Sequence, residues 1–219
     1  MTAIRVFYAK TGRAKYLSHL DTMRTLTRAL RRSRLPLWHT EGFNPHLYIT
    51  FALPLPLGHE GLRETFDVRL TAGIEPAEAA LRMRAAMPDG FEILEAAPPV
   101  MQPKEIAWAD YCVRVFYGGD IVNHARESFD SFNAQPQINT LKRTKKGDVE
   151  IDIKPLAQVI SAKIEGDALS LELRMAAGIN LNLNPDLYLK AFHTRAGIEP
   201  ERVQIARTAV LTGNLENFR

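Results

Sequence analysis

The order in which strand-like and helix-like patterns follow one another constrains this 219-residue chain more than any other feature. A strand-like alternation over residues 4–9 precedes a helical pattern from Ser18 to about Arg34. Further strand-like segments follow at 37–40, 47–52 and 65–71, and a helix that begins at Pro76 leads to a closing strand at 91–97. Strand, helix, strands, helix, strand is the order of the ferredoxin-like plan, in which helices pack on one face of an antiparallel sheet.

The second half of the sequence repeats this order. We expect a strand at 111–117, a helix at 120–132, strands near 138–144, 149–153, 159–165 and 168–175, a helix at 185–195 and a strand at 202–211. Pro76 and Pro185 each begin a helix and lie 109 residues apart, and Gly90 and Gly197, which follow those helices, lie 107 apart. Proline at a helix start and glycine after a helix end are common in proteins generally. The repeated spacing therefore supports a duplication of the first half of the chain without establishing it.

A cluster of prolines separates the two halves. Pro98, Pro99 and Pro103 interrupt any regular element and place the boundary at residues 98–104. The sequence therefore predicts an α+β fold with two ferredoxin-like modules, residues 1–98 and 104–219, each an antiparallel sheet with helices on one face.

Cysteine content and hydropathy restrict the setting in which the chain works. Cys112 is the one cysteine, so an intramolecular disulfide and a thiolate-held metal or iron–sulfur cluster are both excluded. The sequence has no apolar stretch approaching the ~20 residues of a membrane-spanning helix. We expect a cytoplasmic protein without a membrane partner.

Positive charge is concentrated at the start of the chain. Residues 1–40 contain nine Lys and Arg residues against Asp21 alone, a net charge of +8, whereas the whole chain has a net charge of +3. A basic region of this kind favours a polyanionic partner. It would equally suit a solvated helix face that keeps the protein in solution, and charge alone leaves both interpretations open.

The first helix carries much of this charge. Ser18 followed by Asp21 is a capping-box pattern at its start. We expect an apolar stripe to be buried and a set of arginines to lie on the opposite side; the stripe is Leu20, Met23, Leu26 and Leu30, and the arginines are Arg24, Arg28, Arg31 and Arg32. Together with Arg13 and Lys15, these arginines are the candidate nucleic-acid ligands.

His19 lies in the first turn of this helix, where free backbone N–H groups and the helix dipole favour anions. It could donate to a phosphate or act as an acid or base. The alternative is a surface histidine beside a cap that Asp21 only completes.

The segment Gly42-Phe43-Asn44-Pro45-His46 contains more recognition chemistry than a turn requires. Phe43 could stack on a base, Asn44 could read a hydrogen-bonding edge and His46 could contact a phosphate. The alternative is an ordinary Asn-Pro turn with Phe43 filling the core. If this loop lies beside the helix start, His19, Asp21, Asn44 and His46 would share one pocket.

Motifs for metal and cofactor binding are missing from the sequence. Neither GxGxxG nor GxxxxGK[ST] occurs, no histidine pair has the HExxH spacing, and no GxSxG supplies a nucleophile. We expect no metal and no cofactor.

Residues Tyr16–Gly58, YLSHLDTMRTLTRALRRSRLPLWHTEGFNPHLYITFALPLPLG, closely resemble the opening of the radical-SAM-linked family, with its SHLD, RALRRS, LP and GFNPH blocks in order. VEIDIKPLA, residues 149–157, is similar to a later signature of that family. Leu47 departs from the family pattern, since a proline often stands at this position after the histidine. HEGLRE, residues 59–64, is a looser version of the family's loop.

The resemblance implies a domain of unknown function that occurs fused to, or beside, radical-SAM proteins. A CxxxCxxC motif, which would hold the four-iron cluster, is missing, so this chain is not itself the radical enzyme. The predicted architecture has a more distant likeness to repeat-associated RNA-processing proteins, which are built from two ferredoxin-like modules and some of which cleave RNA with histidine and without metal; a likeness of fold does not carry function.

Three hypotheses follow for the function. The first is an accessory protein that binds RNA, or an RNA-bound protein, for a radical-SAM partner. The second is a metal-independent RNA-processing enzyme with His19 or His46 as acid or base. The third is a protein adaptor whose basic helix docks on an acidic patch.

Overall fold

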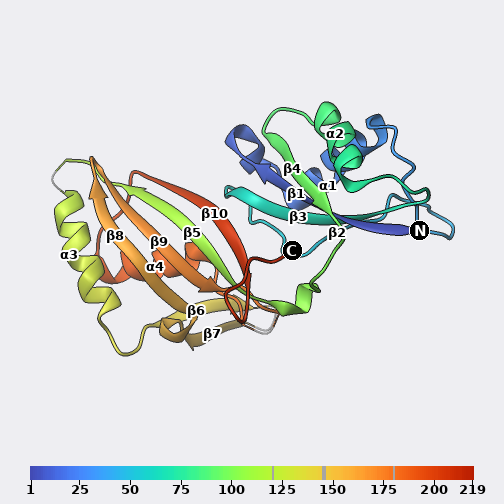
Figure 1. Ribbon diagram of the computed structural model, residues 1–219. Helices are drawn as coiled ribbons and strands as arrows, with labels where there is room; N and C mark the ends of the chain where they lie inside the picture. Colours follow the sequence, from blue (N-terminus) through green and yellow to red (C-terminus); the bar gives the residue numbers. More distant parts are fainter. Residues whose placement is uncertain (120, 145–146, 180) are drawn as a thin grey trace. The chain divides into compact units, whose positions relative to one another are not determined.

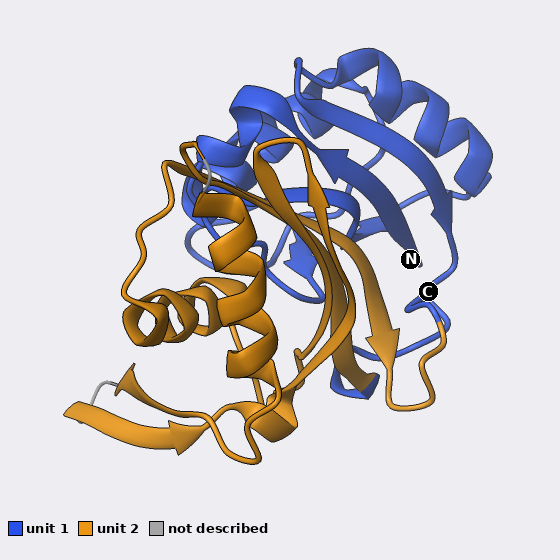
Figure 2. Cartoon of the chain, turned by 90° about the vertical axis from the view of Figure 1, so that its left-hand side faces the viewer, with its two compact units in different colours: residues 1–105, 217–219 blue, residues 106–216 orange. Residues whose placement is uncertain are grey.

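The computed structural model describes residues 1–119, 121–144, 147–179 and 181–219 (Figure 1). The chain divides into two compact units, unit 1 with residues 1–105 and 217–219 and unit 2 with residues 106–216 (Figure 2). No helix among the described residues is long and apolar enough to cross a membrane.

Unit 1 has the predicted order of elements. These are β1 (Thr2–Lys10), η1 (Gly12–Tyr16), α1 (His19–Arg32), β2 (Ile49–Phe51), β3 (Glu60–Leu70), α2 (Pro76–Ala86), β4 (Phe91–Ala97) and η2 (Pro103–Glu105). Its strands lie in the order β4-β1-β3-β2, and each neighbouring pair is antiparallel. This is the ferredoxin-like arrangement.

Buried apolar side chains alternate along the strands of unit 1, and they show which face of its sheet the helices cover. Ile4, Val6 and Tyr8 of β1 are buried in one core cluster with Leu26 and Leu30 of α1. Ala79, Ala80 and Met83 of α2 belong to the same cluster, so both helices pack on one face, as Figure 1 shows for α1 and α2. The other face carries the alternate residues, including Arg5 and Arg69.

Unit 2 contains β5 (Ile106–Phe116), α3 (Ile121–Asn133), β6 (Asn139–Thr144), β7 (Gly147–Asp152), η3 (Lys154–Leu156), β8 (Ala157–Glu165), β9 (Ala168–Ala176), α4 (Pro185–Ala196) and β10 (Arg202–Thr212). Its main sheet has the order β10-β5-β9-β8, again antiparallel throughout. With β6 and β7 set aside, unit 2 repeats the strand order of unit 1. β6 and β7 form a separate hairpin inserted between α3 and β8.

The α+β fold class is confirmed, and most elements lie within two or three residues of their predicted positions. β2 is shorter than the predicted strand at 47–52, and β3 and β5 each begin five residues earlier than the strands predicted at 65–71 and 111–117. The strand predicted at 37–40 was wrong, because those residues make isolated bridges at Leu37 and His39 instead of a continuous strand. Asp120, the predicted start of the third helix, lies outside the described residues. The prediction of two separate modules with a boundary at residues 98–104 stays a prediction.

Candidate functional site

Helix α1 begins at the predicted cap. The Ser18 hydroxyl accepts a hydrogen bond from the Asp21 backbone N–H at 3.1 Å and donates one to Asp21 Oδ2 at 2.7 Å. Arg24 Nη1 donates to the other carboxylate oxygen at 3.2 Å. The hydrogen bond from Ser18, with a smaller contribution from Arg24, holds the pKa of Asp21 below its ordinary value. The Asp21 carboxylate is therefore ionised and engaged within its own helix.

The exposed side of α1 differs from the prediction at Leu20. Its buried side consists of Thr22, Leu26, Ala29 and Leu30. Leu20 was predicted to be buried with them and is 55% exposed. It recurs at helical spacing with Arg24, Thr27 and Arg31 and therefore lies on the arginine side of the helix. That side combines apolar and basic residues.

Residues 37–48, which we call the arm, form a narrow hairpin beside the sheet. Isolated bridges join Leu37 to Leu70 and His39 to Leu47, and the Thr40 N–H donates to the His46 carbonyl at 2.8 Å. The predicted GFNPH loop is the tip of this arm. Gly42 has a φ of +121°, a conformation that side chains with a Cβ rarely adopt.

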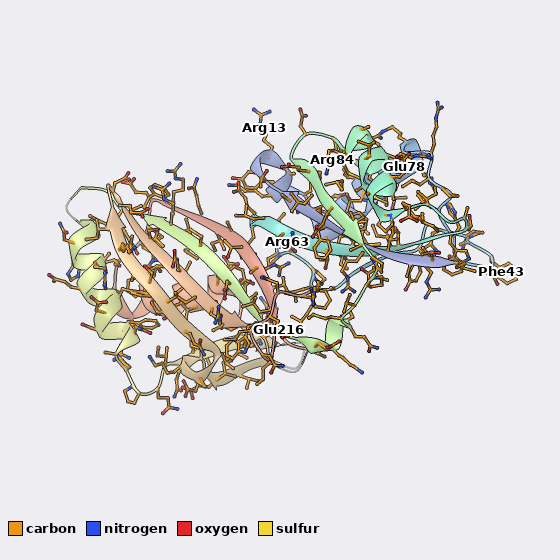
Figure 3. All side chains as sticks on the ribbon, viewed as in Figure 1. Arg13, Phe43, Arg63, Glu78, Arg84 and Glu216 are labelled. Atoms are coloured by element: carbon orange, nitrogen blue, oxygen red, sulfur yellow. The ribbon has the colours of Figure 1, made fainter. Side chains whose placement is uncertain are left out.

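His46 is fixed at the neck of the arm and Phe43 projects from its tip. His46 Nδ1 and Thr40 Oγ1 are 2.9 Å apart, and the His46 backbone N–H donates to the same hydroxyl at 3.1 Å. The Asn44 carbonyl lies 3.2 Å from His46 Nδ1. Phe43 is fully exposed and points away from the protein (Figure 3), so it does not fill the core.

A groove of about 270 Å³ lies between α1 and the end of the arm, and we call it the α1 groove. Its lining residues are Leu20, Met23, Arg24, Thr27, Arg28, Arg31, His46, Leu47 and Ile49. The side chains of Arg28 and Arg31 are exposed, and among the described residues neither has a carboxylate within 4.0 Å. The groove thus combines an apolar floor with guanidinium groups that are free to bind an anion.

The other predicted ligands lie elsewhere in unit 1. The His19 and Phe51 rings form a T-shaped pair with a centroid distance of 5.0 Å, and His19 is not among the residues that line the α1 groove. Arg32 donates to the Ala86 carbonyl at 2.9 Å and so ties α1 to the end of α2. The pocket predicted for His19, Asp21, Asn44 and His46 stays a prediction, and of these four only His46 lines the groove.

The turn before α1 holds the remaining basic candidates. Lys15 Nζ lies 3.5 Å from Glu60 Oε1, and the Gly12 N–H donates to the same carboxylate oxygen at 3.1 Å. Arg13 projects outward from this turn (Figure 3). Lys15 is therefore partly neutralised by Glu60, whereas Arg13 has no ion-pair partner among the described residues.

Lys10 is a buried charged residue near this turn, and no sequence pattern predicted its burial. Lys10 is 1% exposed and its ammonium donates to the Leu17 carbonyl at 2.9 Å. Burial lowers the pKa of Lys10, and the nearby Glu64 carboxylate partly opposes this. His59 is also buried, at 3% exposure. Among the described residues, no three His, Cys, Asp or Glu side chains lie close enough together to hold a metal ion.

An aromatic cluster on the helix-free face was likewise not predicted. The Trp38 and Tyr48 rings lie 5.5 Å apart, and the Arg69 guanidinium lies 4.4 Å from the Tyr48 ring centroid and 5.2 Å from that of Trp38. The alternation of apolar residues around Tyr48 could have indicated its face. Its pairing with Trp38 depends on the arm, which local patterns do not specify.

Residues 3–185 match the model of a protein family described as "Uncharacterized protein conserved in bacteria (DUF2344)". The match covers most of the chain. The chain belongs to the DUF2344 family. The DUF2344 match includes α1 and the arm and ends at Pro185, where α4 begins.

The other comparisons give information on the fold of the DUF2344 chain alone. No curated protein matches the sequence. A chain in the "Crystal Structure of a Cbf5-Nop10-Gar1 Complex" is similar over 94% of this chain, with a TM-score of 0.50 and 12% sequence identity. The DUF2344 chain spans about half of that chain, 48% of its length. At this identity the similarity concerns architecture alone.

Proposed function

We propose that this protein binds RNA through the α1 groove and acts as an accessory to a radical-SAM enzyme in the cytoplasm. The observation that carries the proposal is the pair Arg28 and Arg31, which are exposed beside one groove without an acidic partner among the described residues. A guanidinium group presents a planar fork of N–H donors that matches phosphate oxygens. Two such groups one helical turn apart can bind successive phosphates of one strand.

The arm supplies the groups that would distinguish RNA from a simple polyanion. His46 lines the α1 groove with its Nδ1 held by Thr40, so Nε2 is the nitrogen left for a ligand. Phe43 presents its whole ring at the tip of the arm. An aromatic ring and a polar edge beside a basic groove are what single-stranded RNA requires.

The link to a radical-SAM enzyme rests on the resemblance of Tyr16–Gly58 to the radical-SAM-linked family. This segment contains α1, the arm and β2, the elements whose residues line the α1 groove. The resemblance is therefore concentrated where the proposed site lies.

The apolar floor of the groove favours a second candidate, a protein adaptor. Leu20 is exposed beside Met23, Leu47 and Ile49, and such a floor rimmed by arginines would suit an acidic amphipathic helix.

RNA cleavage by His46 is a third candidate, and it would require a histidine whose titration governs the rate. Replacing His46 by Gln would then abolish cleavage, whereas an RNA-binding site would tolerate it with modest loss.

The test is the affinity of the native protein for a single-stranded RNA at several salt concentrations, measured by fluorescence anisotropy. We expect Arg28→Glu/Arg31→Glu to weaken binding and to flatten its dependence on salt, by about 0.7 in logarithmic slope for each phosphate that the protein no longer neutralises. Lys104→Glu/Lys163→Glu is the matched control, because it makes the same change in net charge at exposed sites outside the groove. Equal affinity in wild type and groove variant would contradict the proposal.

A further inference from the structure

We infer that Trp38 and Tyr48 form a stacking platform for an unpaired nucleobase, so the RNA that this protein takes is single-stranded. The inference rests on the proposed function and names its substrate class. Trp38 and Tyr48 come from the two sides of the arm, and Arg69 comes from β3. We call these three residues the platform.

The platform lies on the helix-free face of the unit 1 sheet. Leu47 and Ile49 are buried in the core cluster beneath the helices, so Tyr48 between them faces the opposite side. The same alternation places Arg69, between Val68 and Leu70, on that side. Ferredoxin-like sheets used in RNA recognition stack bases on aromatic residues of this face.

The Arg69 guanidinium lies over both rings, 4.4 Å from the Tyr48 centroid and 5.2 Å from that of Trp38, so a base would stack on a ring face that Arg69 does not cover. The two rings are tilted by 58° at a centroid distance of 5.5 Å, so neither covers the face of the other as parallel stacked rings would. Trp38 and Tyr48 are both half-buried. Backbone hydrogen bonds fix their positions, because the Trp38 N–H donates to the Arg69 carbonyl at 2.8 Å and the Tyr48 N–H donates to the Trp38 carbonyl at 3.2 Å.

The charge of the platform matches a nucleotide. Asp67, on the same face of β3, accepts two hydrogen bonds from Arg5 at 2.8 Å, and Arg69 has no ion-pair partner among the described residues. The Arg69 guanidinium can therefore contact the phosphate of the nucleotide whose base stacks on the rings. A neutral peptide would leave this charge uncompensated.

The arm connects the platform to the α1 groove. His46 lines the groove and Tyr48 is two residues further along, a distance of about 7 Å in extended chain. A base in a duplex is stacked and paired, and so could not reach the rings without being flipped out.

The emission of Trp38 tests the inference directly. The chain has two tryptophans, so Trp108→Phe leaves Trp38 as the single indole reporter in the full-length protein. The ligands are a short single-stranded RNA, the same strand with abasic sites, and its duplex. We expect the single strand to quench Trp38 emission by at least half at saturation, and the abasic strand and the duplex to bind without quenching.

A second variant measures the contribution of stacking. Tyr48→Leu in the Trp108→Phe protein should weaken single-strand binding about fivefold or more and leave the affinity for the abasic strand unchanged. Single-strand binding with unaltered Trp38 emission would overturn the platform and leave the groove in place. Failure of all three ligands to bind would overturn the proposed function and the platform together.

Discussion

Arg5 is a buried charged residue on the helix-free face of unit 1. It is 1% exposed, and its guanidinium donates to both carboxylate oxygens of Asp67 and to the Met101 carbonyl at 2.9 Å. It also lies 4.3 Å from the ring centroid of Phe218. The guanidinium therefore links β1, β3, the segment after β4 and the last residues of the chain.

We expect Arg5→Met to lower the free energy of unfolding by about 3 kcal/mol, because it leaves Asp67 and the Met101 carbonyl without their donor. Arg63→Met is the control, since the Arg63–Glu95 ion pair is exposed and such pairs contribute about 0–1 kcal/mol. Chemical denaturation of the two variants measures both values. Equal losses would show that Arg5 is no more important than a surface residue.

His193 gives unit 2 a predictable response to pH. Its Nε2 lies 2.8 Å from the Tyr117 hydroxyl, and both residues are buried. Burial lowers the pKa of His193, with Glu199 partly opposing. The folded protein therefore holds a neutral imidazole that the unfolded chain protonates at a pH near 6.5.

Because the unfolded state binds the extra proton, this contribution to stability is complete above about pH 6.5 and is lost as the pH falls below it. The free energy of unfolding should decrease by up to about 1.4 kcal/mol per pH unit in that range from this group. His193→Gln should flatten the decrease, and His124→Gln, at an exposed position, should not. An unchanged pH dependence in His193→Gln would contradict the assignment.

At the scale of elements, the sequence was informative where a signal is local. The cap at Ser18, the helix starts at Pro76 and Pro185 and the strand alternation all depend on neighbouring residues, and the structure has these elements where they were expected. Leu20 was misassigned because helical periodicity defines two adjacent faces of α1 and does not say which of them the sheet covers. The small residues Thr22 and Ala29 mark the face of α1 that the sheet covers, because both are buried.

The site was less predictable than the fold. The α1 groove forms where α1 meets residues 46–49, and the platform forms where the arm meets β3. Both require contacts between segments distant in sequence, which composition and periodicity do not encode. Arg28, Arg31 and His46 could be selected by residue type, whereas Trp38 and Arg69 carried no motif that marked them.

The arm itself provides a prediction at this scale. Thr40→Val keeps the shape of the side chain and removes the hydroxyl that holds His46 at two points. We expect RNA affinity to fall about threefold to tenfold because the arm loses preorganisation. We expect the free energy of unfolding to change by less than about 1 kcal/mol, since the neck is solvent-exposed. Unchanged affinity in anisotropy titrations would show that the neck does not position the site.

At the scale of the whole molecule, the two units repeat one strand order with different additions. Unit 1 has the arm between α1 and β2, and unit 2 has the β6–β7 hairpin between α3 and β8. Both insertions follow the first helix of the repeated order. Unit 1 combines the positive charge, the α1 groove and the platform, and the proposed RNA site therefore lies in unit 1.

The central claim is that RNA lies along the α1 groove, and photo-cross-linking of the native protein to a 4-thiouridine-containing single-stranded RNA tests it most directly. Mass spectrometry of the cross-linked peptides locates the bound RNA on the chain. We expect cross-links in peptides that contain residues 19–32 and 37–49, and their disappearance in Arg28→Glu/Arg31→Glu but not in Lys104→Glu/Lys163→Glu. Cross-links confined to residues 106–216, or equal yields in both double variants, would contradict the claim.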